Sequence, residues 1–202
     1  MGSVFRYIVF LLLPLTLNAR LVRVEIAERS PILDGKPFGT VGAYDRLIGK
    51  AHFAVDPLAP ANRDVVNLKL GPRNTKGEVE FYADFVVFAP RDPAKGNGTL
   101  LFEVANRGRK GILHVFNRAA SSNDPRTAAE FGDGLLMEQG FTLAWLGWQF
   151  DVPREPPLMS VTVPVANNPD GTPITGWVRH FVRKKQPVAQ RELCQSFIRH
   201  KV

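Results

Sequence analysis

The sequence predicts an α/β fold, with a mixed β-sheet that starts from antiparallel strands and continues into a β-α-β unit. Two observations carry this prediction. Three segments before residue 90 alternate apolar and polar residues, as half-buried antiparallel strands do. Farther along, two apolar runs are joined by a connection with helix signals, and a crossover of this length implies a parallel pair. At 202 residues, 45% of them hydrophobic, the chain can bury a core.

The leading strands are expected over 21–26, 42–56 and 78–89. In the first strand, apolar residues alternate with Arg23 and Glu25, which predicts that one face packs against the core. In the third strand, every second residue from Val79 to Val87 is apolar, and Pro90 ends the run. These strands therefore form the antiparallel start of the sheet.

The β-α-β unit covers residues 99–151. Its first strand, 100–105, is apolar on both faces apart from Glu103, a composition typical of interior strands in parallel or mixed sheets. Its second strand is expected over 141–148, which is also apolar. The two strands should lie side by side and end at the same edge of the sheet.

The connection inside this unit carries helix-end signals. Asp124 and Pro125 fit the cap and the first position of a helical turn. Asp133 is expected to cap a second piece over 134–139, and Gly140 suits the residue that ends it. We therefore predict a broken helical crossover.

Three parts of the chain differ in composition. Residues 1–19 fit a signal peptide, 20–182 a folded domain with a further strand at 158–165 and a hairpin return at 175–182, and 183–202 a basic tail. The apolar run at the N-terminus is too short to span a bilayer comfortably but suits an export signal, so a periplasmic or extracellular location is expected. The alternatives are a hydrophobic first strand or an uncleaved anchor.

Charge and cysteine content exclude several classes of function. The net charge of +7 is concentrated at the C-terminal end, where residues 179–202 hold seven basic residues and one acidic residue. No nucleic-acid-binding motif accompanies it, so a nucleic-acid partner is not expected. A single cysteine excludes an internal disulfide, and the four histidines lack metal-ligand spacing, so neither a metal nor a cofactor is predicted.

The candidate site lies where the two parallel strands end. The loop NRGRKG contains Asn106, Arg107 and Gly108, and loops at this end of a strand are where open α/β sheets place ligands. Its glycines let backbone amides point at an oxyanion. Gln149 and Asp151 follow the second strand and are expected at the same edge. The alternatives are an ordinary loop with solvated cations and, for Gln149 and Asp151, structural packing.

No residue of the sequence has the setting of a catalytic nucleophile. None of the serines is flanked by the glycines of G-x-S-x-G, the strained turn that exposes a hydrolase nucleophile. His114 lies near the candidate loop, where a structural role is the more usual one. No serine, histidine and carboxylate can be assigned as a triad, so no catalytic residue is predicted.

Three runs carry a resemblance to a known family. They are EVANRGRKG, FGDGLLMEQGFTLAWLGWQFDV and VPVANNPDGTPITG. The chain, over about residues 20–182, resembles bacterial exported proteins called α/β hydrolase domain-containing proteins. The resemblance implies the N-terminal half of an α/β-hydrolase sheet, and a serine-type enzyme that needs no metal and acts on a small ester or related acyl substrate. It also implies that amides near Asn106, Arg107 and Gly108 form part of an oxyanion hole.

In that family the nucleophile, acid and histidine lie after later strands. We therefore expect this chain to be a truncated portion with an incomplete fold, inactive alone, whose residues 183–202 arise from a frame change or incomplete gene. Residues 100–105 would then be an exposed apolar edge that promotes self-association. The alternative is a non-catalytic β-rich binding or accessory module of an exported protein.

Overall fold

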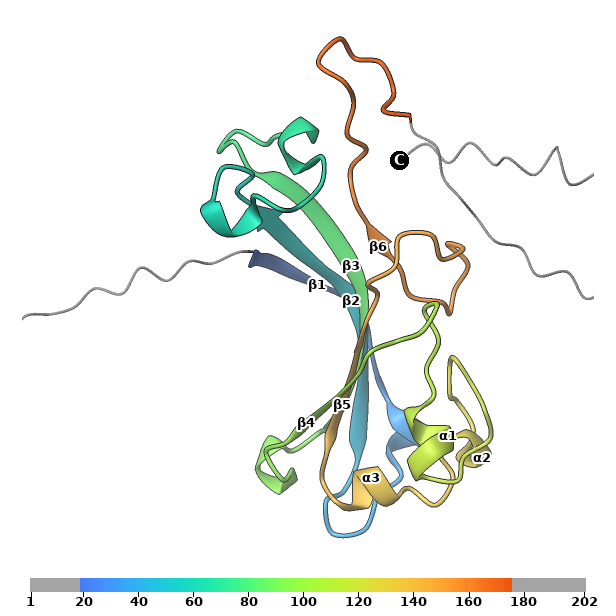
Figure 1. The fold of residues 1–202 in the computed structure, drawn as a ribbon. Coiled ribbons are helices and arrows are strands. Elements are labelled where there is room, and N and C mark those ends of the chain that lie inside the picture. Colours follow the sequence, from blue (N-terminus) through green and yellow to red (C-terminus); the bar gives the residue numbers. More distant parts are fainter. Residues whose placement is uncertain (1–18, 176–202) are drawn as a thin grey trace, which may run out of the picture.

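The computed structural model describes residues 19–175, which form a mixed open sheet with short helices (Figure 1). The strands are β1 Arg20–Pro31, β2 Tyr44–Val55, β3 Val79–Pro90, β4 Leu100–Glu103, β5 Thr142–Leu146 and β6 Val161–Thr162. The α-helices are α1 Ile112–Phe116, α2 Ala128–Phe131 and α3 Leu135–Glu138. Short 3₁₀ turns are η1 Ile32–Gly35, η2 Pro60–Asn62, η3 Leu68–Leu70 and η4 Pro93–Lys95. The α/β prediction is confirmed at this level.

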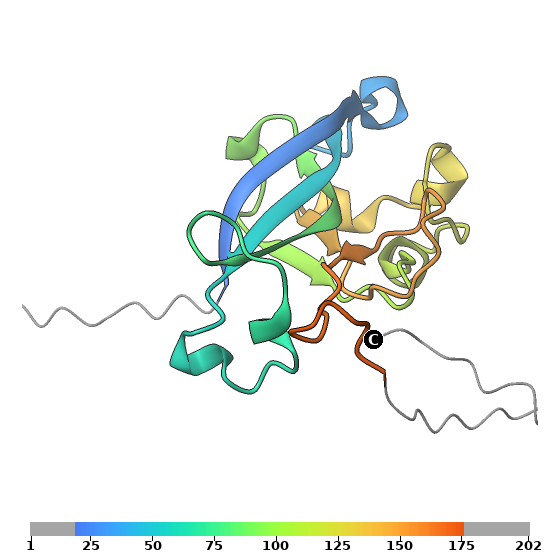
Figure 2. The ribbon, with the colours of Figure 1, turned by 90° about the horizontal axis from the view of Figure 1, so that it is seen from above.

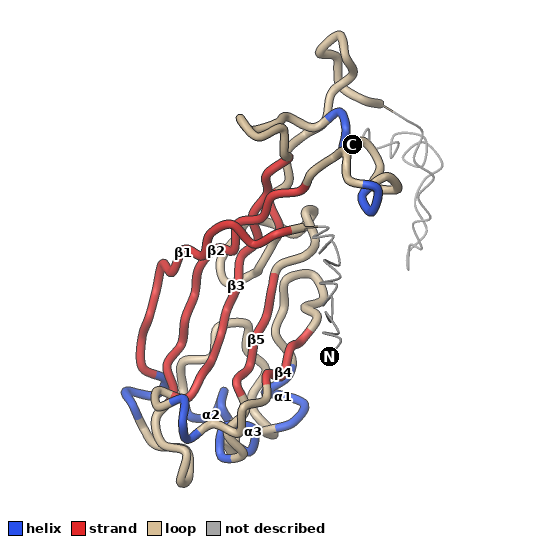
Figure 3. The backbone as a smooth tube through the Cα atoms, turned by 90° about the vertical axis from the view of Figure 1, so that its left-hand side faces the viewer, coloured by secondary structure: helices blue, strands red, loops and turns tan. Residues whose placement is uncertain are grey.

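The sheet has the strand order β1-β2-β3-β5-β4 (Figure 3), and β6 is added beside β3 (Figure 1). The first three strands pair antiparallel as a meander, and β5 pairs antiparallel with β3. β4 and β5 run parallel, with Leu101 opposite Leu143 and Glu103 opposite Trp145. The predicted parallel pair joined by a helical crossover is therefore confirmed.

The core lies on one side of the sheet, where α1, α2 and α3 gather (Figure 2). The Phe88 ring packs 5.0 Å from Trp145 and 5.8 Å from Phe131, measured between centroids. Tyr44 is buried and donates its hydroxyl to the carbonyls of Met137 and Phe141 at 3.0 Å. Its burial raises the pKa of the phenol to about 12. These contacts join the antiparallel strands to the crossover.

The opposite face of the sheet is apolar, and no described helix covers it. Val24 and Ile26 of β1 are 51% and 52% exposed, and Leu100 and Phe102 of β4 are 58% and 48% exposed. The expectation that the apolar face of the first strand packs against the core is therefore wrong within the described residues. The alternation of apolar and polar residues located the strand correctly, but the helices cover the face opposite to Val24 and Ile26.

The crossover differs from the prediction in two places. α1, directly after the glycine-rich loop, was not predicted. α2 begins at Ala128 instead of Pro125, because the carboxylate of Asp124 pairs with Arg46 and Arg126 and caps no helix. The carboxylate of Glu130 accepts hydrogen bonds from the first amides of that turn instead. The second helical piece is confirmed as α3, and Gly140 follows it, but its N-cap is Gly134 and not Asp133. The Asp133 carboxylate still accepts a hydrogen bond from the Leu135 amide at 3.1 Å.

The last part of the domain is less regular than predicted. The strand expected over 158–165 shrinks to β6, two residues long. The hairpin return at 175–182 lies outside the described residues apart from its first residue. The signal peptide, apart from its last residue, and the tail at 183–202 also lie outside them. None of the helices in the described part has the length and apolar character needed to cross a membrane.

Candidate functional site

The glycine-rich loop leaves the carboxyl end of β4, and the residues after β5 contact it directly. The amide of Arg107 donates to Oε1 of Gln149 at 2.6 Å. The Arg107 guanidinium donates to Oδ2 of Asp151 at 2.6 Å and to the Asp151 carbonyl at 3.1 Å. Three residues predicted from separate positions in the sequence are therefore brought together at one edge of the sheet.

Gly108 holds the loop against the segment that precedes β6. Its carbonyl accepts a hydrogen bond from the Met159 amide at 3.1 Å. Its φ is 73°, and a Cβ added there would lie 2.4 Å from the Met159 carbonyl oxygen. Only glycine fits this approach without a shift of backbone. Because Arg107 also has a positive φ, of 53°, the loop is held in an unusual conformation by contacts on both sides.

The amides of the loop divide into engaged and unengaged donors. Gln149 occupies the Arg107 amide, so this donor is not directed at a ligand. The amides of Asn106 and Gly108 have no acceptor among the described residues. Asn106 is exposed, and its backbone carbonyl accepts a hydrogen bond from the amide of Arg109 at 3.2 Å. Two of the three predicted amides therefore have no acceptor in the described structure.

Glu103 anchors the start of α1, a role that the sequence analysis missed. Its carboxylate accepts hydrogen bonds from the amides of Gly111 and Ile112 at 2.9 and 3.0 Å, and from the Trp145 indole. Nearby, the Trp148 indole donates to the Ala105 carbonyl. The signal was present in the sequence, since Glu103 is the only charged residue in an apolar strand.

A groove with a volume of about 670 Å³ lies on the helix side of the sheet, next to the glycine-rich loop, but the predicted site residues do not line it. Side chains of β1, β2 and β3 form one wall, and the segments 123–126 and 154–160 form the other. Lys110 of the glycine-rich loop lies in this lining. Sequence reasoning missed the groove because its lining comes from segments far apart in the chain.

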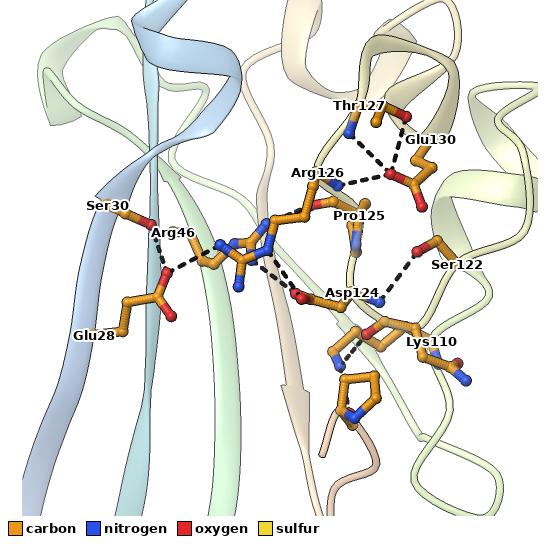
Figure 4. A network of polar contacts seen from close by, with 12 residues as sticks. Glu28, Ser30, Arg46, Lys110, Ser122, Asp124, Pro125, Arg126, Thr127 and Glu130 are labelled. Carbon is orange, nitrogen blue, oxygen red and sulfur yellow. Dashed lines mark hydrogen bonds and ion pairs between the residues drawn. The ribbon is translucent and has the colours of Figure 1, made fainter.

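Charged side chains cross-link the groove walls (Figure 4). Arg46 of β2 is buried and donates to Asp124 at 2.7 Å and to the carbonyl of Pro125. Arg126 pairs with the same Asp124 at 2.9 Å and reaches Glu28 of β1 at 3.4 Å. Burial lowers the pKa of Arg46, an effect that Asp124 partly offsets. This network fixes the 124–126 segment against the sheet.

Lys110 is the most perturbed cation of the groove. Its ammonium donates to the carbonyls of Asn123 at 2.7 Å and Pro157 at 3.3 Å, and it has no carboxylate partner within 4 Å in residues 19–175. Burial lowers the pKa of this lysine to about 8. A lysine held in this way is costly for the fold and is more common at functional sites than elsewhere.

The serines and histidines of the described residues form no catalytic pair. Ser30 donates to Glu28, Ser160 to Asp84, and neither touches a histidine. The Nδ1 of His114 contacts the Ala119 carbonyl at 2.8 Å, a structural contact within the turn after α1. His52 contacts Arg23 on the sheet surface. Within residues 19–175, no cluster of three or more histidine, cysteine or acidic side chains could hold a metal.

The site therefore consists of a fixed loop with two free amides at the sheet edge and a charged groove beside it. Neither part contains a nucleophile paired with a base in the described structure. Comparison of the chain with protein-family models, with curated proteins and with solved structures finds no match.

Proposed function

We propose that this chain forms the oxyanion side of an α/β-hydrolase-type acyl hydrolase that acts on an ester or a related acyl substrate. The observation that supports the proposal is the loop after β4. Its amides at Asn106 and Gly108 lack acceptors within the described structure, while its conformation is fixed by Gln149, Asp151 and Met159. The sheet also has the leading antiparallel strands and the parallel pair that the resemblance implies.

A fixed loop of this kind suits acyl transfer. Attack on an ester carbonyl moves negative charge onto the carbonyl oxygen, and donors that are already oriented stabilise this charge without reorganising. The contacts of Arg107 with Gln149 and Asp151 keep the two neighbouring amides in place before the substrate arrives. The chain's own contribution is therefore orientation and charge stabilisation.

The nucleophile, base and acid would come from polypeptide that packs against the free edge of β4. This part of the proposal is supported by the pairing of β4, which has β5 as its single neighbour in the described sheet. The adjoining apolar face, with Leu100 and Phe102 about half exposed, fits the same interpretation. We also propose that residues 1–19 direct export, which places the substrate in the periplasm or outside the cell.

A p-nitrophenyl ester assay tests the proposal. The chain as it stands should give no turnover above buffer, whereas the chain extended by any hydrolase-like reading frame downstream of its gene should be active and sensitive to a serine-directed phosphonate. Activity of the chain alone would contradict the assignment of the nucleophile. An inactive but folded extended protein would contradict the hydrolase assignment.

Variants of the loop test its role within the extended protein. Arg107→Lys removes the paired contacts with Asp151, and Gln149→Met removes the acceptor that holds the Arg107 amide. Each should lower kcat about tenfold or more with little change in KM, because amides that bind the developing oxyanion act mainly in the transition state. Arg109→Lys is the matched control, since this neighbouring side chain is exposed and forms no hydrogen bond or ion pair with the described residues. Equal effects of all three variants would rule out the positioning role.

A further inference from the structure

We propose that the groove between the sheet and the segments 123–126 and 154–160 binds a small-molecule carboxylate with an apolar body. The inference is independent of the hydrolase proposal, because binding needs no nucleophile and no added polypeptide. It rests on the size of the groove, on acidic side chains that already have partners, and on three cations that form no ion pair with the described residues.

The size and lining of the groove suit a small organic molecule. A volume of about 670 Å³ falls within the range of roughly 300–1,000 Å³ that small-molecule sites occupy. Ile48 and Val86 of the sheet and Leu158 of the opposite wall supply apolar surface. The same lining holds charged side chains, so an apolar body with one charged group matches it better than a uniformly polar ligand.

The acidic side chains of the groove are already engaged. Glu28 accepts from Ser30 at 2.7 Å and pairs with Arg126, while Asp124 pairs with both Arg46 and Arg126. The other two carboxylates, Glu25 and Asp84, accept hydrogen bonds from Arg23 and from the amide and hydroxyl of Ser160. Four carboxylates therefore have partners before any ligand enters.

Three cations of the groove lack such partners. Lys50, Lys110 and Arg154 line it, and none of them forms an ion pair within residues 19–175. The Lys50 ammonium lies 4.7 Å from the centre of the Tyr82 ring, and the Lys110 ammonium contacts two carbonyls. The lining holds five cations against four carboxylates, so a bound carboxylate would offset the surplus positive charge.

The environment of Lys110 makes it the main anchor. Because the side chain is largely buried, a carboxylate next to it would be screened little by water and would form a strong, charge-assisted hydrogen bond. Lys50 and Arg154 are exposed and would contribute less. The ammonium of Lys110 should therefore contribute most of the affinity for the carboxylate, and Lys50 and Arg154 should each increase it by a smaller factor.

Titration calorimetry of the full chain at pH 7 tests the inference. The probes are octanoate and 4-phenylbutyrate, which distinguish a straight-chain from an aromatic body, and octanamide, which has no charge. At least one carboxylate should bind saturably with one site, and the amide about tenfold or more weaker, since a hydrogen bond between charged groups is lost. Equal binding of octanoate and octanamide, or no binding of either carboxylate, would overturn the inference.

Substitutions locate the site. Lys110→Met should weaken carboxylate binding about tenfold, and Arg154→Gln, on the exposed rim, should weaken it by a smaller factor without a risk to folding. Lys69→Met, in η3 and outside the groove lining, is the control and should bind as the unmodified chain does. Unchanged affinity in both groove variants would place the bound carboxylate elsewhere and refute the proposal, whatever the outcome of the ester assay.

Discussion

Gly108 shows how a single residue fixes the candidate loop. We expect Gly108→Ala to lower the free energy of unfolding by about 2–4 kcal/mol, because both the positive φ and the contact with Met159 disfavour a side chain. Urea denaturation followed by circular dichroism measures this loss. Gly77→Ala is the control: its φ is 79°, but nothing lies within 4 Å of the added Cβ, so about 1 kcal/mol is expected. Equal losses would mean that the Met159 contact is unimportant.

Lys110 links stability to pH. Its pKa falls from 10.5 to about 8 on burial, so the folded protein binds fewer protons than the unfolded chain between these values. The stability of the unmodified chain should therefore rise as the pH increases from about 8 to 10.5. Lys110→Met removes the cost of burying the charge and should raise the free energy of unfolding at pH 7 by about 2 kcal/mol.

The advantage of Lys110→Met should shrink as the pH approaches 10.5, the pKa of an unburied lysine. Denaturation curves at several pH values, with the exposed Lys69→Met as control, measure this trend. A pH-independent difference would show that the gain comes from packing and not from the charge. If the groove binds carboxylates as proposed, the same substitution improves stability while it weakens binding, which is a common trade-off at functional sites.

At the scale of single elements, Glu130 decides where α2 begins. Hydrogen bonds from the Arg126 amide, the Ser122 hydroxyl and the Thr127 amide lower the pKa of the Glu130 carboxyl to about 2. The stability that it contributes is therefore present above pH 4.5, the ordinary value for a glutamate, and is lost as the pH falls toward 2.

Glu130→Gln should lower the free energy of unfolding by about 1 kcal/mol at neutral pH, the usual cost of losing a helix cap. The difference from the unmodified chain should shrink as the pH falls toward 2 and disappear below it, where both side chains are neutral. Thermal melts between these limits give the measurement. Glu138→Gln, on the exposed surface of α3, should show no such trend. A constant difference for Glu130→Gln would contradict the capping role.

The elements differ in how far local sequence predicted them. Alternation located β1, β2 and β3, and the apolar runs located β4 and β5, because each pattern matches the geometry of a strand. α1 was missed because it is only five residues long and its start is held by Glu103, eight residues before Gly111. The start of α2 was misplaced because Asp124 binds Arg46 of a distant strand. In both cases the start of the helix depends on a contact with a residue outside the helix and its flanking turn.

At the scale of the whole molecule, the uncovered apolar face and the free edge of β4 are continuous. A β-strand with one unpaired edge and exposed apolar side chains is a template for another chain. We therefore propose that the chain by itself self-associates through β4. Replacing Leu100 and Phe102 with lysine should weaken association by about tenfold in Kd.

Sedimentation velocity over a range of concentrations measures the effect of Leu100→Lys and Phe102→Lys. The control is Val66→Lys, at a side chain that is 83% exposed and lies outside the sheet. A monomer that melts in one sharp, cooperative transition would contradict the proposal. If the self-association survives both β4 substitutions, the contact lies elsewhere on the molecule.

Local sequence patterns predicted strands β1 to β5 and the parallel pair of the β-α-β unit, since periodicity and the length of a crossover are local properties. They also placed Arg107, Gln149 and Asp151 at one edge, because parallel strands end together. The packing of segments far apart in the chain set which face of the sheet the helices cover and which loop amides lack an acceptor. The same packing half-buries Lys110 in the groove. These features depend on contacts between segments that are far apart in the chain. The energies of such contacts cannot be read from the residues next to each other in the sequence.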